Sequence, residues 1–285
     1  TTGSTINLSD FSVNKKYSFF NPKAGINFQM NNKNRLYFSV ARAFREPTRS
    51  DFESNPEIMP EELVDYELGW NYKLEKMQFK TNWYFMSYKN QLVLTGEIDD
   101  VGAPVRENSG KSYRHGLEIE SLFDLSDKIS VNANISLSEN KNIDYVTSFD
   151  GEIVNLGDTK ISFSPKLISY IGFMYTPSEK LYLSFLNKHI GKQYMSNTEA
   201  ELSKLESYTV SDLNLIYKLK NTLFFSEIIV SAMVNNLFNI EYVSNGYYYT
   251  YDDNWSDINN ITTIEGTGYY PQAKRNYLLG ISMKF

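Results

Sequence analysis

The stretch DYELGWNYKL, residues 65–74, alternates strictly between apolar and polar side chains. One face carries tyrosine, leucine and tryptophan, and the other face carries only aspartate, glutamate, glycine, asparagine and lysine. A period of two places successive side chains on opposite faces of a β-strand. The segment therefore predicts a strand with one fully polar face, and ISVNANISLS at 129–138 repeats the pattern.

Alternating runs of this kind recur along the whole chain, with turn residues between them. No amphipathic helix of normal length competes with them, so we expect an all-β fold built as one antiparallel meander. The eleven expected strands span residues 17–30, 35–46, 61–75, 77–95, 111–125, 129–145, 165–177, 181–195, 205–220, 224–240 and 269–285.

The connections between these runs alternate in length. Short polar turns are expected at 31–34, 75–76, 126–128, 177–180 and 220–222. Longer segments are expected at 47–60, 96–110, 146–164, 196–204 and 241–268. In a meander this order places every long loop at one end of the sheet. Outer-membrane barrels have short periplasmic turns and longer extracellular loops, whereas a soluble sandwich has no reason for the asymmetry.

Composition narrows the class of protein further. Aromatic residues make up 15% of the 285 residues, and tyrosine and tryptophan near strand ends suit the interfacial girdles of a membrane barrel. No run of 18 apolar residues is present, which excludes a helical membrane protein. A net charge of −6 argues against nucleic-acid binding, and the lack of cysteine excludes thiolate metal sites. A soluble β-sandwich with an inward apolar face is the alternative interpretation.

The end of the chain carries a further signal. In RNYLLGISMKF, residues 275–285, alternate positions are apolar up to the last residue. This ending resembles the assembly signal of bacterial outer-membrane barrels, in which apolar residues follow a glycine at fixed spacing and the last is aromatic. Gly280, Met283 and Phe285 occupy those places.

Other segments resemble TonB-dependent outer-membrane receptors, in the order in which that family has them. The segments are RLYFSVARAFREPTRSDF (35–52), PEELVDYELGWNYK (60–73), WYFMSYKNQLV through HGLEIE (83–120), VNNLFNIEYV (234–243) and YYPQAKRNYLLGISMKF (269–285). The resemblance covers most of the chain. It implies a transmembrane β-barrel in the outer membrane of a Gram-negative bacterium, with no enzymatic activity and no cofactor.

Barrels of this class have 22 strands around a plugged lumen, so eleven strands correspond to half of one. On this interpretation residues 1–285 form the C-terminal half, residues 1–16 belong to an extracellular loop, and the plug domain is absent. The N-terminal half with the plug is expected as a separate chain or missing segment, because an open sheet in lipid leaves two unpaired edges. The family implies the TonB complex, acting through the plug, and outer-membrane lipid as further partners.

Candidate ligand contacts lie in the loop NGYYYTYDDNWSD, residues 245–257, which contains Tyr247, Tyr248, Tyr249, Tyr251 and Trp255. Amphipathic aromatics on an external loop give a large contact area at a low entropic cost. An outer aromatic girdle, or packing between loops, explains the same residues equally well.

Charged residues near strand ends and on the polar faces are expected to face the plug or the cargo. They are Arg42, Arg45, Glu46, Asp65, Glu67, Glu118 and Glu120. The two histidines, His115 and His189, are isolated, so no catalytic site and no metal site is expected.

Acidic loops offer a calcium-binding alternative, but solvated carboxylates explain them better. The residues concerned are Asp99, Asp100, Asp252, Asp253 and Asp257.

The resemblance implies energised uptake of a scarce nutrient complex, with a ferric siderophore or another iron chelate as the leading cargo. Haem, cobalamin and glycan uptake by SusC-like relatives are alternatives within the family. A non-transporting barrel, either a membrane enzyme or an adhesin, is a second class of function. A soluble secreted β module that binds glycans through its aromatic loop is a third.

Overall fold

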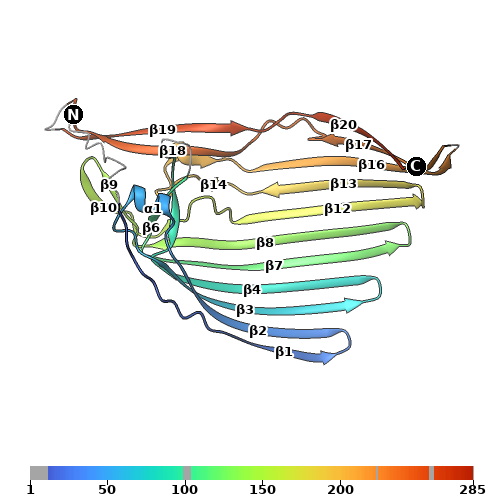
Figure 1. Ribbon diagram of the computed structural model, residues 1–285, viewed down its shortest axis with the longest axis horizontal. Helices are drawn as coiled ribbons and strands as arrows, with labels where there is room; N and C mark the ends of the chain where they lie inside the picture. The colour runs from blue at the N-terminus through green and yellow to red at the C-terminus, as the bar shows by residue number, and fades with distance from the viewer. Residues whose placement is uncertain (1–11, 99–103, 223, 257–259, 285) are drawn as a thin grey trace.

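The computed structural model describes residues 12–98, 104–222, 224–256 and 260–284. Eleven long strands form one antiparallel sheet in the order β1-β2-β3-β4-β7-β8-β12-β13-β16-β17-β20, and the short strand β11 (Thr159–Lys160) pairs with β8. Figure 1 shows these strands lying side by side as a curved wall. The long strands are β1 (Lys23–Asn31), β2 (Asn34–Arg45), β3 (Glu61–Leu74), β4 (Met77–Lys89), β7 (Lys111–Ser126), β8 (Ile129–Ile143), β12 (Leu167–Ser178), β13 (Leu181–Ile190), β16 (Tyr208–Thr222), β17 (Phe225–Asn235) and β20 (Asn276–Lys284).

The predicted all-β antiparallel fold is confirmed, and the eleven strands occur in the predicted order. Their outer ends differ from the prediction. Residues 17–22 form no strand, and the predicted strand 77–95 ends at Lys89. Asn90 and Asn236 take positive φ angles of 53° and 50°, a conformation that asparagine tolerates, and the chain leaves the wall there.

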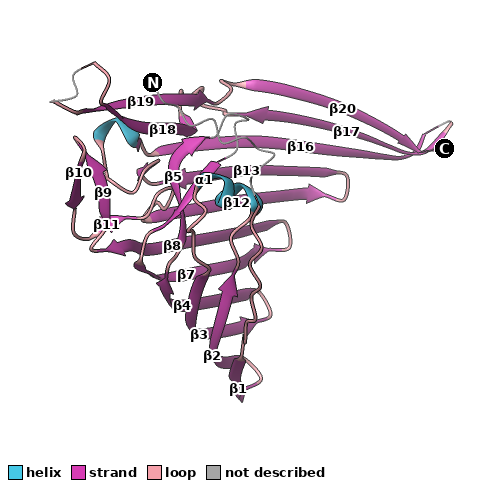
Figure 2. Cartoon of the chain, turned by 60° about the vertical axis from the view of Figure 1, so that its left-hand side comes forward, coloured by secondary structure: helices cyan, strands magenta, loops and turns pink. Residues whose placement is uncertain are grey.

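The long connections all lie at one end of the wall, and they contain hairpins that the sequence did not reveal (Figure 2). The additional elements are α1 (Arg49–Ser54), β5 (Leu92–Ile98), β6 (Pro104–Asn108), β9 (Val146–Phe149), β10 (Glu152–Asn155), β14 (Gln193–Tyr194), the 3-10 helix η2 (Glu201–Ser203), β15 (Lys204–Leu205), β18 (Val243–Asp253) and β19 (Thr262–Pro271). In the described part of the chain, no helix is long and apolar enough to span a membrane.

The apolar face of the wall is exposed instead of packed into a core. Leu68 in β3 is 50% exposed and Leu279 in β20 is 76% exposed. The buried apolar side chains among the described residues lie in the external segments or at the outer ends of strands. They are Phe52, Ile58, Leu92, Val93, Tyr145, Ile161, Ile190, Met195, Leu205 and Tyr248. A soluble sandwich would bury the apolar face of the wall against a second sheet, and the described residues form no such layer.

The polar face of the wall is ordered by tyrosines that lie over glycines of the neighbouring strand. Tyr37 pairs with Gly69, and a Cβ at Gly69 would lie 2.0 Å from the Tyr37 ring. The Tyr37 hydroxyl donates a hydrogen bond to Asn82 Oδ1 at 2.9 Å. Gly116 leaves room in the same way for the Tyr84 hydroxyl. These two glycines therefore allow large rings to cover the wall's inner surface.

Candidate functional site

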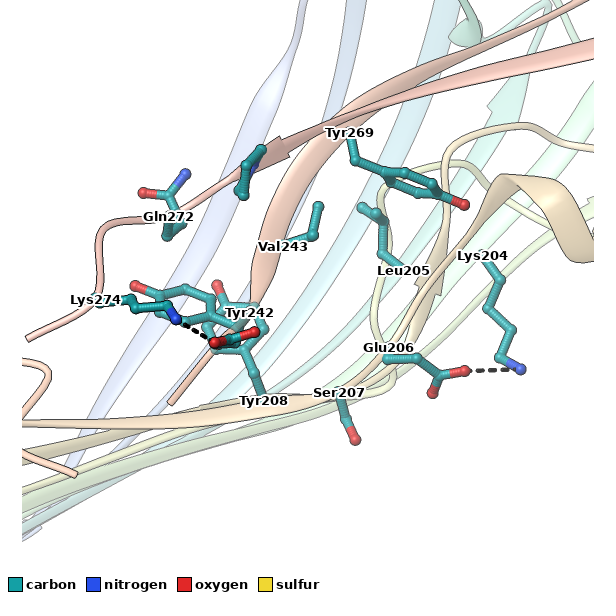
Figure 3. Close-up of a pocket in the computed structure, with 12 residues that line it drawn as sticks. Lys204, Leu205, Glu206, Ser207, Tyr208, Tyr242, Val243, Tyr269, Gln272 and Lys274 are labelled. Atoms are coloured by element: carbon teal, nitrogen blue, oxygen red, sulfur yellow. Dashed lines mark ion pairs between the residues drawn. The ribbon is translucent and has the colours of Figure 1, made fainter. Parts of the chain in front are cut away.

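A cavity of about 490 Å³ lies at the outer end of the wall, between the start of β16 and the base of the β18–β19 hairpin (Figure 3). Three segments far apart in the sequence form it, at 204–208, 241–243 and 269–274. The lining residues are Lys204, Leu205, Glu206, Ser207, Tyr208, Glu241, Tyr242, Val243, Tyr269, Pro271, Gln272 and Lys274.

Aromatic rings make up much of this cavity. Tyr208 and Tyr242 stack with their ring centroids 4.4 Å apart, and Leu205 is almost fully buried beside them. The Tyr269 hydroxyl donates a hydrogen bond to the Leu202 carbonyl at 3.1 Å, which fixes this ring on the other wall of the cavity. Burial raises the pKa of Tyr242, and the Asp212 carboxylate raises it further. The Tyr242 phenol is therefore a neutral hydrogen-bond donor at physiological pH.

The rim of the cavity is charged but nearly balanced. Lys204 Nζ lies 2.7 Å from Glu201 and 2.9 Å from Glu206, and Lys274 forms an ion pair with Glu241. The hydrogen bonds that Lys204 donates to Glu201 and Glu206 raise the pKa of Lys204, and the bond that Lys274 donates lowers the pKa of Glu241. Exposed ion pairs of this kind contribute little stability, so they can be exchanged for contacts with a ligand. The rim therefore presents charged side chains of both signs to a ligand.

A second cavity of about 590 Å³ lies where the β5–β6 hairpin reaches β18. Leu94, Ile98 and Phe163 give it an apolar lining, and Gln193 and Asn245 add polar groups. Gly96 permits the close approach of the two hairpins, because it has a φ of +101° and a Cβ there would lie 3.1 Å from the carbonyl oxygen of Tyr248 in β18. The outer end of the wall thus holds two cavities whose walls come from converging hairpins.

The predicted ligand-contacting tyrosines separate onto two faces of β18. Tyr248 is only 3% exposed and packs with Met195 and Leu205. Its hydroxyl donates to Glu265 Oε1 at 2.6 Å, and burial and this carboxylate raise the pKa of Tyr248. The Tyr248 ring therefore belongs to a buried core, unlike the other four aromatic residues of the predicted set.

The other four predicted aromatics form a row on the opposite face, which we call the aromatic ladder: Tyr247, Tyr249, Tyr251 and Trp255. Successive ring centroids lie 6.4, 6.4 and 5.5 Å apart, and successive ring planes differ by only 17°, 8° and 11°. The last three rings are 41%, 42% and 65% exposed. The ladder therefore presents an accessible row of nearly parallel rings.

The hairpins at the outer end are tied to one another by hydrogen bonds. Asp252 Oδ1 accepts a bond from the Thr263 hydroxyl at 2.7 Å, and Asp252 Oδ2 accepts bonds from Ser148 Oγ at 3.1 Å and the Gly151 amide at 3.2 Å. Asp150 Oδ1 accepts a bond from the Thr263 amide at 2.7 Å. The tip of the β9–β10 hairpin is thereby docked on the β18–β19 hairpin, and we call this contact the hairpin latch.

Most of the predicted charged residues lie on the polar face of the wall. Strand register places Asp65, Glu67, Glu118 and Glu120 on the face that carries Tyr37. Glu67 accepts a hydrogen bond from Ser39 at 3.0 Å, and Glu120 lies 3.1 Å from Lys80.

At the outer end of β2, Arg45 pairs in register with Glu61 and therefore shares the polar face. Glu46 follows the strand and lines a separate surface hollow with Tyr17 and Phe52.

Arg42 lies on the other face of the wall. It shares the apolar face with Phe38, and its Nη2 lies 2.8 Å from Glu62 on the same face. Its guanidinium also sits 4.7 Å from the centre of the Phe44 ring. The side chain is therefore directed away from the polar face.

The residues of the predicted assembly signal lie on opposite faces of β20. Gly280 pairs with Ser231 on the polar face, and Met283 is exposed on the apolar face. Phe285 lies outside the described residues.

Within the described ranges, no group of three or more histidine and carboxylate side chains is placed to hold a metal ion. His189 Nδ1 lies 2.8 Å from Thr209 Oγ1, and the His115 ring stacks on Tyr113. Asp99, Asp100 and Asp257 from the calcium alternative lie outside the described residues.

The sequence did not single out Tyr208 or Tyr242. A signal was present, since Tyr242 closes the family-like segment VNNLFNIEYV and Tyr208 begins an alternating run. The two rings stack because the segment between β17 and β18 crosses the start of β16. Alternation of apolar and polar residues does not predict such a crossing.

An antiparallel wall with one exposed apolar face, one polar face and all long loops at one end defines a segment of an outer-membrane β-barrel. Residues 1–237 match the family model described as TonB dependent receptor-like, beta-barrel. The chain therefore belongs to this family of Gram-negative outer-membrane receptors, which is not a family of enzymes. A search of curated protein sequences finds no significant match.

Solved structures of such receptors share the fold. The ferric-catecholate import receptor Fiu from E. coli K12 superposes with a TM-score of 0.64 at 15% identity over 92% of this chain and 34% of Fiu. The ferric yersiniabactin uptake receptor FyuA from Yersinia pestis superposes with a TM-score of 0.62 at 15% identity. The match covers 91% of this chain and 36% of FyuA. The copper transporter OprC superposes with a TM-score of 0.65 at 16% identity. The match covers 91% of this chain and 39% of OprC. The chain thus spans little more than a third of the receptors it matches.

Proposed function

We propose that this chain forms part of the wall of a TonB-dependent importer whose cargo is a metal chelate, with a ferric siderophore or another iron chelate as the leading class. Membership of the receptor family carries the proposal. Two of the similar structures are named as receptors for ferric chelates, and the third is named as a copper transporter. Those names support a metal-containing cargo and leave the metal and the chelator open.

The cavity at Tyr208 and Tyr242 is the binding site that we assign to this cargo. Its aromatic and apolar lining suits the organic part of a chelate, because such surfaces bind planar ligands by stacking and burial. The neutral phenol of Tyr242 and the paired charges at Lys204 and Lys274 supply the polar contacts that orient a ligand. Binding at this outer position would precede transport through the lumen.

The polar face of the wall is proposed to contact the plug. Asp65 and Glu67 lie on β3, and Glu118 and Glu120 lie on β7, on the other side of β4. Only some of these carboxylates are paired with lysine or serine. A plug with complementary cations would satisfy them. The TonB complex would act on the chain only through that plug.

The remaining strands of the barrel are proposed to pair with β1 and β20. Each of these strands is bonded on one side only in the described sheet, and every residue of β1 is exposed. Unpaired backbone groups in lipid cost several kcal/mol each. A partner segment, in the same polypeptide or as a second chain, would close the wall and complete the lipid-facing surface.

Uptake by the full-length receptor tests the proposal. Cells would be given radioactive iron bound to a panel of chelators, and copper complexes in parallel, with and without an inner-membrane proton gradient. We expect energy-dependent uptake of at least one iron chelate. Because each lost stacking contact is worth about 0.5–1.5 kcal/mol, the double variant Tyr208→Ala/Tyr242→Ala should weaken binding about tenfold.

Tyr277→Ala is the matched control, since Tyr277 is exposed on the apolar face of β20 and does not line the cavity. It should leave chelate binding unchanged. If the receptor takes up copper complexes and no iron chelate, the cargo is a copper complex and the assignment of iron is wrong. Equal binding by the Tyr208→Ala/Tyr242→Ala variant and the unmodified receptor would remove the cavity from the proposal.

A further inference from the structure

The aromatic ladder is held in a fixed arrangement by its neighbours. Tyr247 and Tyr249 pair with Gly268 and Gly266, and a Cβ at either glycine would lie 2.4 or 2.3 Å from the tyrosine ring. Each ring thus lies over the backbone of β19, and any side chain there would displace it. The spacing of the rings follows from the strand, since alternate residues of β18 share one face.

The end of the ladder is fixed by a turn. Asp253 Oδ1 accepts hydrogen bonds from the Trp255 amide at 3.2 Å and the Ser256 amide at 3.0 Å. This turn places the Trp255 ring 5.5 Å from Tyr251 and nearly parallel to it. Four large rings are therefore held in a row, although exposure of so much aromatic surface to water is unfavourable.

The ladder faces away from the buried cluster of Met195, Leu205 and Tyr248. The opposite face of β18 carries Tyr248, which packs on Met195 and Leu205, and Gly246, which approaches Met195 Sδ. A cargo held in the cavity at Tyr208 would lie on the side of that cluster. Cargo binding therefore does not explain why the ladder is exposed.

The ladder also lies beyond the hydrocarbon layer. A membrane-spanning strand needs about 9–11 residues, and β17 and β20 already have 11 and 9. The β18–β19 hairpin continues outward from them in the same direction (Figure 1). Tyr249 is the seventh residue of β18, so at about 3.3 Å per residue it stands roughly 20 Å beyond the start of the hairpin. An aromatic girdle at the lipid interface would lie lower.

The chemistry of this face fits an uncharged saccharide. Aromatic rings with hydroxyl groups combine an apolar surface with hydrogen-bonding edges, and this suits the C–H faces and hydroxyls of successive sugar rings. Asp253 adds a polar group to the same face of β18. The carboxylates of Asp252 and Glu265 make the hairpin acidic, and like charges would repel a phosphate-rich ligand.

We propose that the aromatic ladder binds the neutral polysaccharide chain of lipopolysaccharide, the saccharide layer that surrounds a receptor at this height above the outer leaflet. The occupant is a linear glycan lying along Tyr247, Tyr249, Tyr251 and Trp255. The contact anchors the β18–β19 hairpin in the surface layer and is separate from cargo uptake.

Binding of purified, lipid-free O-polysaccharide to the full-length receptor in detergent tests this assignment. The expected signals are a calorimetric binding isotherm and a change in Trp255 fluorescence, identified by its loss in Trp255→Phe. Removal of two rings in Tyr249→Ala/Tyr251→Ala should weaken binding about tenfold. Tyr249→Phe/Tyr251→Phe keeps both rings and should retain most of the affinity. Tyr277→Ala is again the matched control and should bind normally.

Chelate uptake by the same variants separates this inference from the proposed function. Tyr249→Ala/Tyr251→Ala should transport iron chelates at the normal rate, whereas Tyr208→Ala/Tyr242→Ala should lose chelate binding and keep polysaccharide binding. The inference is overturned if the receptor does not bind O-polysaccharide, or if the ladder variant binds it as well as the unmodified receptor. Preference for the lipid A and core fraction over O-polysaccharide would also overturn it.

Discussion

The wall exposes its apolar side chains, whereas the outer end buries them. In the wall, Leu68 and Leu279 point their side chains outward and are half or more exposed. At the outer end, Met195 is fully buried, and Leu205 and Tyr248 pack against it. Both regions contain many aromatic and aliphatic residues, so composition alone does not distinguish them.

The difference lies in what surrounds each region. The outer end buries apolar groups away from water, as a soluble domain does. The wall satisfies its backbone through the strand ladder and leaves its apolar face for lipid. Mutations of similar size should therefore have effects that depend on the region and on the face.

Removal of a core side chain at the outer end should have the largest effect. Met195→Ala deletes a fully buried side chain beside Leu205 and Tyr248, and changes of this type cost about 2–5 kcal/mol. The loss should be local, so hydrogen exchange in the full-length receptor should accelerate at 191–207 and 243–253. Met233→Ala is the control, since Met233 is 39% exposed on the wall. Equal losses of protection in the two variants would contradict the distinction.

A charge on the apolar face of the wall should have a somewhat smaller effect. Leu68 lies near the middle of β3, between Phe38 and Trp83 on the neighbouring strands. An arginine facing lipid at the midplane costs about 2–4 kcal/mol. Leu68→Arg should therefore lower the free energy of unfolding of the full-length receptor from lipid vesicles by this amount, measured in denaturant.

The polar face provides the control for that experiment. Asn134 pairs with Glu120 on this face, so Asn134→Arg places its charge beside a carboxylate and away from lipid. The free energy of unfolding should change by less than about 1 kcal/mol. If both arginines cost the same, the two faces of the wall do not differ in their surroundings.

The wall was predictable from sequence because successive side chains of each strand alternate between its apolar and polar faces. In 65–74 every second residue meets a different solvent, and the structure places those residues on the two faces as predicted. The same period places Arg42 on the apolar face with Phe38.

The outer end was not predictable in the same way. In VSNGYYYTYDD, residues 243–253, both faces of the strand carry tyrosine, since one face packs into a core and the other forms the ladder. Alternation is therefore absent from this sequence. The cavity at Tyr208 and Tyr242 depends on contacts between distant loops, and no local pattern encodes them.

The hairpin latch should give the smallest effect, and its pH dependence follows from Asp252. Hydrogen bonds from Thr263 and Ser148 and from the Gly151 amide lower the pKa of Asp252 below its ordinary value. A depressed pKa means that the carboxylate contributes stability above its unfolded pKa, and that this contribution is lost as the pH falls through the folded pKa. The latch should therefore hold at neutral pH and open well below pH 4 or so.

Because the chain contains no cysteine, spin labels on Glu152→Cys and Asn260→Cys would report the distance between the two hairpins without competing sites in this chain. We expect a narrow distance distribution at neutral pH and a broad one at an acidic pH below the lowered pKa of Asp252. Thr263→Val removes the hydroxyl that Asp252 accepts from, so its distribution should be broad at both pH values. Thr262→Val makes the same change at an exposed neighbouring position and should behave as the unmodified chain does. A distribution that is unchanged between the two pH values would show that Asp252 does not hold the hairpins together, and that the outer end is fixed by its apolar core alone.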